Sequence, residues 1–212
     1  MCGLAFLLVL PAFCQDPFVV AADHYKLELD NEWVQIARVS YRPHDTAPVH
    51  DHPRRPAIYI YVVDGGPIAF AHDKIGKITR PAVKAGGVRY ARPNIEKHEV
   101  EYLGNIPTEY LRVELKTEDP DPLVRDIRLA PELHSGTESV YKPEFENSQI
   151  RLIRIYCGGG QTCTSASLPD FPAILVNLDD RQVKWIAPLT PAAALPRGDY
   201  IRIELKTKPS IF

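Results

Sequence analysis

Two histidines separated by a single residue, His50 and His52, are the part of this sequence best suited to chemistry. On a β-strand, residues two apart point to the same face of the sheet, so the two imidazoles would lie close together. Neutral imidazole nitrogens held in this way can bind a divalent transition metal. The spacing alone is weak evidence, and its meaning depends on the elements around the pair.

The surrounding sequence predicts β-strands. β-Branched and aromatic residues dominate the segment 57–63 (AIYIYVV), and apolar and charged residues alternate in 111–115 (LRVEL) and 201–205 (IRIEL). The chain also contains 20 prolines, many in turn-like contexts, which disfavour long helices. We therefore predict an all-β protein in which the histidine pair lies on a strand.

The chain contains two similar copies of one segment. Residues 25–64 align without a gap to residues 141–180 at an offset of 116, and the segment 109–117 (EYLRVELKT) returns as 199–207 (DYIRIELKT) at an offset of 90. The second copy is therefore 26 residues shorter (116 − 90). Each copy is far longer than one unit of a solenoid, which predicts two small β-domains.

The second copy lacks the histidine pair. Ala166 and Leu168 stand at the positions that align with His50 and His52. Metal chemistry is therefore expected only in the first copy, with the second as a structural partner.

The segments 43–53 and 87–105 together resemble the two motifs of the cupin superfamily of small jelly-roll β-barrels. The positions that carry this resemblance are the three histidines of the motifs, His50, His52 and His98, and the frame of the second motif, Gly87, Pro93 and Gly104. The resemblance implies that the three histidines bind a metal ion inside a barrel. Through the repeat it extends to the second copy, so the whole chain resembles two cupin-like barrels in tandem, a bicupin whose second domain is truncated and degenerate.

One departure from the family pattern concerns its carboxylate ligand, which the resemblance places near residues 56–58. No acidic residue lies between His52 and Asp64. The implied ligands are then three neutral imidazoles, as in the three-histidine cupin dioxygenases, which use Fe(II). A divalent ion held this way keeps its full charge and favours an anionic chelating substrate. Fe(II) is the expected metal, and Zn, Mn or Ni would also suit these ligands.

Five further side chains are candidates for substrate contacts. Arg54 and Arg55 follow the histidine pair and could pair with a substrate carboxylate, or be solvated loop residues. Tyr59 and Tyr61 share one strand face and could line the barrel pocket or simply fill it, and Tyr90 is a candidate of the same kind.

Acidic residues flank the third histidine. Glu96, Glu99 and Glu101 lie on either side of His98, and one of them could fix the tautomer of an imidazole. His44, in the loop before the pair, is expected to have a surface or hydrogen-bonding role.

Residues 1–14 are expected to form an export signal. The apolar run 4–10 is well short of the roughly 20 residues of a membrane span, and small residues precede a cleavage site after Cys14. A buried N-terminal strand is the alternative. Removal of the segment leaves Cys157 and Cys163, which could form a disulfide or remain as buried thiols. The mature protein is then expected to be secreted or periplasmic.

The sequence therefore predicts a signal at 1–14, a cupin domain with the three-histidine site at 18–117, a linker at 118–139 and a degenerate cupin domain at 140–209. The formal net charge of −2 argues against nucleic acid as a partner, and a homodimer is compatible with the sequence. Two functions remain open, an Fe(II)-dependent dioxygenase acting on a small anionic molecule and a non-catalytic module that binds a small ligand or a metal. A second titratable group facing the histidines would favour the enzyme, and a dry apolar pocket would favour the module.

Overall fold

The computed structural model describes residues 15–72, 75–94, 96–118, 125–132, 134, 136–159, 163–165 and 170–210. The predicted export signal and the positions Ala166 and Leu168 lie outside these ranges. Within them, the only helix, α1 (Pro17–Val20), has four residues, and all other regular elements are strands, so the all-β prediction is confirmed. None of the described helices has the length and apolar character needed to cross a membrane.

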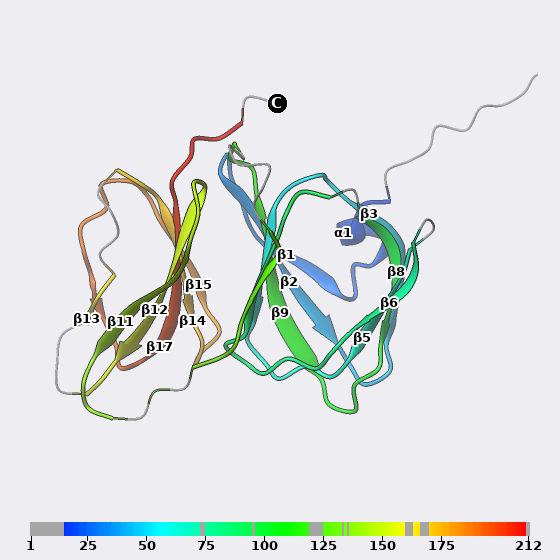
Figure 1. Ribbon diagram of the computed structural model, residues 1–212, viewed down its shortest axis with the longest axis horizontal. Helices are drawn as coiled ribbons and strands as arrows, with labels where there is room; N and C mark the ends of the chain where they lie inside the picture. The colour runs from blue at the N-terminus through cyan, green and yellow to red at the C-terminus, as the bar shows by residue number, and fades with distance from the viewer. Residues whose placement is uncertain are drawn as a thin grey trace, which may run out of the picture.

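The first half folds into a barrel made of two antiparallel sheets. Its strands are β1 (Tyr25–Asp30), β2 (Val34–Tyr41), β3 (Thr46–His52), β4 (Ala57–Tyr61), β5 (Ile68–His72), β6 (Gly76–Arg80), β7 (Val88–Ala91), β8 (Glu96–Tyr102), β9 (Thr108–Leu115) and β10 (Ile127–Leu129). One sheet has the order β1-β2-β9-β4-β7-β10 and the other the order β3-β8-β5-β6. The two sheets face each other (Figure 1). Val39, Phe70 and Val100, which come from both sheets, pack together in the space between them. Strand β10 lies within the predicted linker and extends the first sheet beside β7.

The second half is a smaller unit. Its strands are β11 (Val140–Glu146), β12 (Ile150–Cys157), β13 (Cys163–Thr164), β14 (Ala173–Asn177), β15 (Val183–Ile186), β16 (Ala194–Leu195) and β17 (Gly198–Leu205). They form a sheet of order β11-β12-β17-β14-β15 and a two-stranded ribbon, β13-β16. The ribbon covers the outer face of this sheet through Ile153, Leu175 and Cys163, and a disulfide joins Cys163 to Cys157, whose Cα atoms are 5.6 Å apart.

The large sheets of the two halves have matching strand arrangements. The order β1-β2-β9-β4-β7 in the first half corresponds to β11-β12-β17-β14-β15 in the second. The first pair of strands in each sheet carries a register shift, between Leu27 and Leu29 in one and between Pro143 and Phe145 in the other. These two shifts are 116 residues apart (143 − 27), which is the offset found in the sequence.

The two large sheets pack face to face through an apolar cluster to which both halves contribute (Figure 1). Leu111 and Val113 of β9 and Ile201 and Ile203 of β17 are fully buried in it. The apolar positions of the alternating segments 111–115 and 201–205 thus face the other half. Consequently, the charged positions of these segments point into the interior of their own half.

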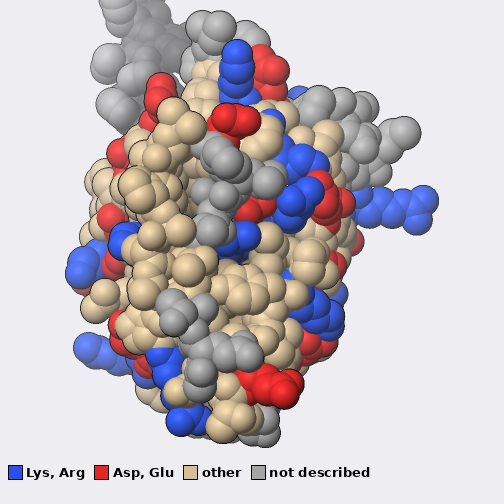
Figure 2. Space-filling model, turned by 90° about the vertical axis from the view of Figure 1, so that its left-hand side faces the viewer, with Lys and Arg blue, Asp and Glu red and all other residues tan. Residues whose placement is uncertain are grey.

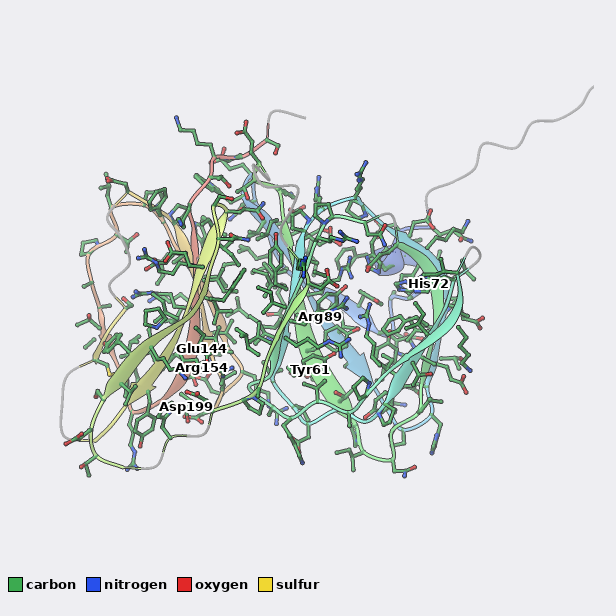
Figure 3. All side chains as sticks on the ribbon, in the orientation of Figure 1. Tyr61, His72, Arg89, Glu144, Arg154 and Asp199 are labelled. Carbon is green, nitrogen blue, oxygen red and sulfur yellow. A yellow bond between two sulfur atoms is a disulfide. The ribbon has the colours of Figure 1, made fainter. Side chains whose placement is uncertain are left out.

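Arginines at equivalent strand positions add polar ties between the halves. In β2, Arg38 pairs with Glu28 at 2.7 Å and donates through Nη2 to the carbonyl oxygen of Arg181, in the second half, at 2.8 Å. In β12, Arg154 pairs with Glu144 of its own half at 2.6 Å and donates through Nη2 to the carbonyl oxygen of Ala130, which follows β10, at 3.0 Å (Figure 3). The two halves are therefore joined by apolar packing at the centre and by hydrogen bonds from these two arginines beside it.

The charged side chains on the face shown in Figure 2 are mixed in sign. Lysine and arginine lie next to aspartate and glutamate around an area of uncharged residues (Figure 2). Binding to nucleic acid requires a surface dominated by basic residues, and the part of this face that the structure describes does not have one.

Candidate metal centre

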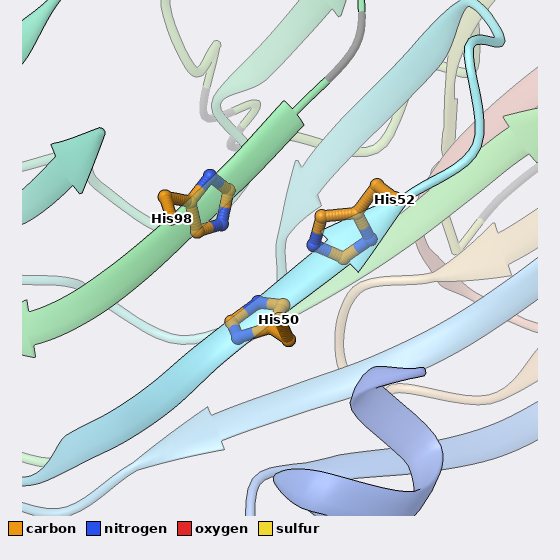
Figure 4. A group of neighbouring side chains, drawn as sticks. All are labelled: His50, His52 and His98. Carbon is orange, nitrogen blue, oxygen red and sulfur yellow. The ribbon is translucent and has the colours of Figure 1, made fainter. Parts of the chain in front are cut away.

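His50, His52 and His98 meet inside the first barrel (Figure 4). Strand β3 carries His50 and His52, and strand β8 carries His98, which is the cross-strand partner of His50. The three residues are 0%, 6% and 3% exposed. One nitrogen from each ring lies within 4.8 Å of the other two. The fold therefore brings together the three residues that the sequence predicted as metal ligands.

The environment of the three imidazoles keeps them neutral. Burial lowers the pKa of His50, and it lowers the pKa of His52 and His98 to about 2. Arg112 adds to the effect on His52, and the neighbouring imidazoles add to the effect on His98. Near neutral pH each ring therefore keeps a nitrogen lone pair, which is the form that binds metals.

Hydrogen bonds set the orientation of the His50 ring. Its Nδ1 lies 2.7 Å from the carbonyl oxygen of Pro48, so Nδ1–H donates and the lone pair remains on Nε2. The hydroxyl of Tyr25 donates to this Nε2 at 3.1 Å. Burial raises the pKa of Tyr25 to about 12, so the phenol stays protonated beside the nitrogen that would bind a metal.

Three buried ring nitrogens have no hydrogen-bond partner among the described residues. They are Nε2 of His52 and both nitrogens of His98. A buried polar atom without a partner costs about 1–3 kcal/mol, and native structures rarely retain several of them together. A metal ion among the rings would use the lone pairs of these histidines, so the residues present fit a metal.

Glu114 supplies a carboxylate beside the histidines, outside the group of three predicted ligands. Its Oε1 lies 3.5 Å from Nδ1 of His52, and the side chain is buried. In the register of β4 and β9, Glu114 is the partner of Ala57, which falls within the window 56–58 where the cupin resemblance places the family's carboxylate. The acidic group is therefore present on the neighbouring strand, where a search along the first motif could not find it.

A buried guanidinium holds this carboxylate in place. Arg112 donates to Glu114 at 3.0 Å, to Glu96 at 2.9 Å and to the hydroxyl of Tyr59. Burial disfavours the charge on Arg112, but Tyr59, Glu96 and Glu114 keep its pKa well above the ordinary value. Burial also opposes ionisation of Glu96, yet Arg112 holds its pKa at about 2.

The charges of this group bear on the substrate preference inferred from the sequence. One cation, Arg112, and two anions, Glu96 and Glu114, give these three side chains a formal charge of −1, which the partly exposed Arg55 beside Glu114 offsets. A divalent ion would therefore leave a positive charge on the centre.

The other acidic candidates have different positions. Glu96 contacts Arg112 and forms no hydrogen bond or ion pair with the imidazole of a described residue. Glu99 is exposed, and Glu101 pairs with Lys77 at 2.6 Å on the outside of the barrel. His44 is exposed in its loop, in agreement with the surface role expected for it.

The two arginine candidates also differ from each other. Arg54 is exposed. Arg55 is partly buried, and its Nη1 lies 4.0 Å from Oε2 of Glu114. Of the two, Arg55 is the one that the fold directs toward the metal centre.

The tyrosine candidates occupy two different environments. Tyr59 joins the Arg112 group inside the barrel, and Tyr61 packs against Tyr110 with ring centroids 5.4 Å apart. The cavity beside them measures only about 10 Å³, so these rings fill the interior at that point. Tyr90 faces the second half, where it packs against Phe145, and it does not reach the barrel interior.

A fourth histidine, His72, stands next to the centre and was not singled out from the sequence. It ends β5 as the cross-strand partner of His98, with ring centroids 5.1 Å apart (Figure 3). Phe70 and His72 occupy alternate positions of the strand 68–72, and Phe70 belongs to the barrel core. This alternation is the signal that could have identified His72 as facing inward.

No protein-family model and no curated protein matches this sequence. Solved structures do match the fold. A putative glyoxylate-induced protein from Pseudomonas aeruginosa has a TM-score of 0.58 at 12% identity over 89% of this chain and 82% of its own. Quercetin 2,3-dioxygenase from Acinetobacter baumannii has a TM-score of 0.54 at 10% identity over 87% and 74%.

A third match is the protein Ylba from Escherichia coli, with a TM-score of 0.54 at 10% identity over 85% of this chain and 81% of its own. Identities this low bear on the fold and leave the activity open. With its two facing antiparallel sheets, the chain shares the fold of these solved proteins, which agrees with the fold that the resemblance to the cupin superfamily implied.

Proposed function

We propose that the first barrel is a metal-dependent dioxygenase domain. His50, His52 and His98 hold one divalent transition ion, with Fe(II) favoured, and the substrate is a small anionic molecule. The observation that carries this proposal is the group of buried imidazole nitrogens that have no other partner. Of the solved structures with this fold, one is a quercetin 2,3-dioxygenase, which agrees with the proposal.

The polar interior favours an enzyme over a binding module. Tyr25 and Glu114 are titratable groups that face the histidines, and Arg112 lies behind them. A module for an apolar ligand would instead present a dry apolar pocket. Buried acidic and phenolic groups beside a metal site are typical of sites that move or hold protons.

Each polar group has a defined task in the loaded site. A bound Fe(II) would provide the place at which substrate and dioxygen come together. The Pro48 carbonyl fixes the tautomer of His50, and Glu114 orients His52 and makes its ring more basic. The Tyr25 hydroxyl can donate a hydrogen bond to a substrate oxygen, and the surrounding barrel core excludes water.

The proposal extends to the rest of the chain. We infer that the second half is a degenerate cupin domain, which buries the apolar face of the first barrel and contributes no metal ligand. We also infer that the protein is exported to a secreted or periplasmic location after loss of residues 1–14. The disulfide between Cys157 and Cys163 supports export, because such bonds persist in oxidising compartments.

Metal analysis tests the central claim. Purified protein is reconstituted with Fe(II) without oxygen, dialysed and analysed for metal, alongside a His50→Ala, His52→Ala double variant. We expect about one ion per chain in the wild type and little in the variant. A His44→Ala, His134→Ala variant removes two histidines outside the barrel and should bind metal normally. Equal metal content in the wild type and the His50, His52 variant would refute the site. A second assay measures oxygen consumption by the metal-loaded wild type with a panel of small carboxylates. Consumption that depends on one of these substrates indicates an enzyme, and its absence favours a binding module.

A further inference from the structure

A cavity of about 530 Å³ opens at the end of the first barrel, on the side of Glu96. It is lined by Arg89, Ala91, Arg92, Asn94, Glu96, Arg125 and Asp126. Three arginines and two acidic residues give it a formal charge of +1 (3 − 2). The metal centre does not use these arginines.

Arg89 has hydrogen-bond donors that no described residue satisfies. Its Nη2 pairs with Asp126 at 2.9 Å, but its Nε and Nη1 are buried without an acceptor. The guanidinium also lies over the ring of Tyr59, 5.3 Å from the centroid, and its side chain is 14% exposed. A guanidinium offers five N–H groups in a planar fork that matches the oxygens of a carboxylate or phosphate. The two unpaired nitrogens of Arg89 could therefore donate hydrogen bonds to a bound oxyanion.

Unlike Arg89, the other two arginines have no counter-ion among the described residues. Within the part of the chain that the structure describes, no carboxylate lies within ion-pair distance of the Arg92 or Arg125 side chain. Asp126 is already engaged, since it binds the Arg89 guanidinium and accepts from the Arg92 backbone N–H at 3.1 Å. An anion in the cavity would supply the missing charge and the missing acceptors together.

The cavity and the metal centre share a wall. Glu96 lines the cavity, and in the register of β3 and β8 it is the partner of His52. Its carboxylate binds Arg112, which in turn binds Glu114 next to His52. A molecule anchored by the arginines would therefore be held beside the histidines.

A larger groove of about 910 Å³ lies elsewhere, between His24 and Glu109, and these two titratable groups have partners. Both ring nitrogens of His24 contact backbone oxygens, at 3.1 Å and 3.0 Å, and Glu109 pairs with Arg38 at 2.7 Å. Two hydroxyls in its lining, those of Tyr41 and Thr108, are buried without a hydrogen-bond partner among the described residues, but they are neutral. The groove therefore lacks a buried, partly unpaired cation such as Arg89, and its larger volume alone does not select it.

We propose that the cavity near Glu96 binds the carboxylate or phosphate group of a small molecule, with Arg89, Arg92 and Arg125 as its donors. The binding site follows from the cavity itself, and only the identification of that molecule as the substrate rests on the proposed function. The site would select substrates that carry an oxyanion and would present them to the metal centre.

The test uses metal-free full-length protein, so that failure of the metal site cannot affect it. Calorimetric titrations with sodium succinate and with sodium phosphate, at constant ionic strength set with sodium chloride, distinguish the two kinds of oxyanion. We expect saturable binding of at least one of them and a loss of about ten-fold or more in affinity in an Arg92→Ala, Arg125→Ala variant, because charge-assisted hydrogen bonds are lost.

Two further variants complete the test. Lys97→Ala, Lys184→Ala removes the same formal charge from exposed positions outside the cavity and should bind as the wild type does. Arg89→Lys keeps the charge but loses the fork, and it should also weaken binding. Thermal melting checks that each variant is folded. Absence of saturable binding in the wild type, or equal affinities in the wild type and the Arg92, Arg125 variant, would overturn the proposal.

Discussion

Replacement of Glu114 by Gln separates the effect of this carboxylate on the metal centre from its effect on stability. The change removes a negative charge 3.5 Å from Nδ1 of His52 and 3.0 Å from Nε of Arg112 while keeping the shape of the side chain. It should therefore make His52 a weaker metal ligand and leave Arg112 with one carboxylate fewer.

The two effects differ in size. Loss of a group that orients a metal-binding histidine typically costs about 10- to 100-fold in metal affinity, which is about 1.4–2.7 kcal/mol. Breaking a buried ion pair costs about 3–5 kcal/mol when a charge is left without compensation. Here Glu96 still binds Arg112 at 2.9 Å and Gln can still accept a hydrogen bond, so we expect a stability loss of about 2 kcal/mol, below that range.

Glu96→Gln is the matched control, because Glu96 also binds Arg112 but forms no hydrogen bond or ion pair with an imidazole among the described residues. Urea unfolding of the metal-free proteins gives the stability changes, and Co(II) titration followed by absorbance gives the affinities. We expect similar losses of stability in both variants and a clearly larger loss of affinity in Glu114→Gln. Unchanged Co(II) affinity in Glu114→Gln, or an equal loss in both variants, would refute the role assigned to Glu114.

Two more predictions concern acidity and the disulfide. The folded pKa of about 2 for His52 and His98 lies below the unfolded value near 6.5, so these groups stabilise the metal-free protein above pH 6.5, and stability should fall by about 2.5 kcal/mol between pH 7 and 5.5. Glu96, with its lowered pKa, loses its contribution only at more acidic pH. Urea unfolding should show a clearly smaller fall in His52→Asn, His98→Asn, where only His50 of the three retains a lowered pKa; an equal fall in both proteins would contradict the prediction. In exported protein, Cys157 and Cys163 should resist alkylation until they are reduced, and the disulfide should add about 2 kcal/mol to the free energy of unfolding. The N-terminus of the exported protein should be Gln15. Free thiols before reduction would contradict the disulfide, and an intact Met1 would contradict the export signal.

The histidine centre was predictable because its signals are local. The spacing of His50 and His52 needs only a strand to place both rings on one face, and the frame around His98 marks a second strand. Strand propensity likewise identified an all-β chain. Tyr90 was a candidate for lining the barrel pocket but faces the second half. Alternation along a strand distinguishes its two faces but does not tell which face lines the barrel. The cross-strand partner of Tyr90 is Ile58, which packs toward the second half.

Arg112 and Glu114 were missed for a related reason. Alternation of apolar and charged residues in 111–115 is typical of a strand with one buried and one solvated face. In this fold the apolar face is covered by the other half, and the charged face points into the barrel. The buried and solvated faces are exchanged because the two large sheets pack against each other, and the sequence of one strand does not reveal that packing.

The same reversal occurs in the second half, which indicates how the centre is built. Arg202 and Glu204 repeat Arg112 and Glu114 on β17, are buried, and pair at 2.9 Å. Glu204 has Arg151 as its further neighbour at 3.7 Å, whereas Glu114 has His52. A buried arginine and glutamate are therefore part of the inner face of both sheets and do not require a metal. The first half adds imidazoles within reach of that carboxylate, so Glu114 has both a structural role toward Arg112 and a role toward His52, and comparison with Glu96→Gln separates the two.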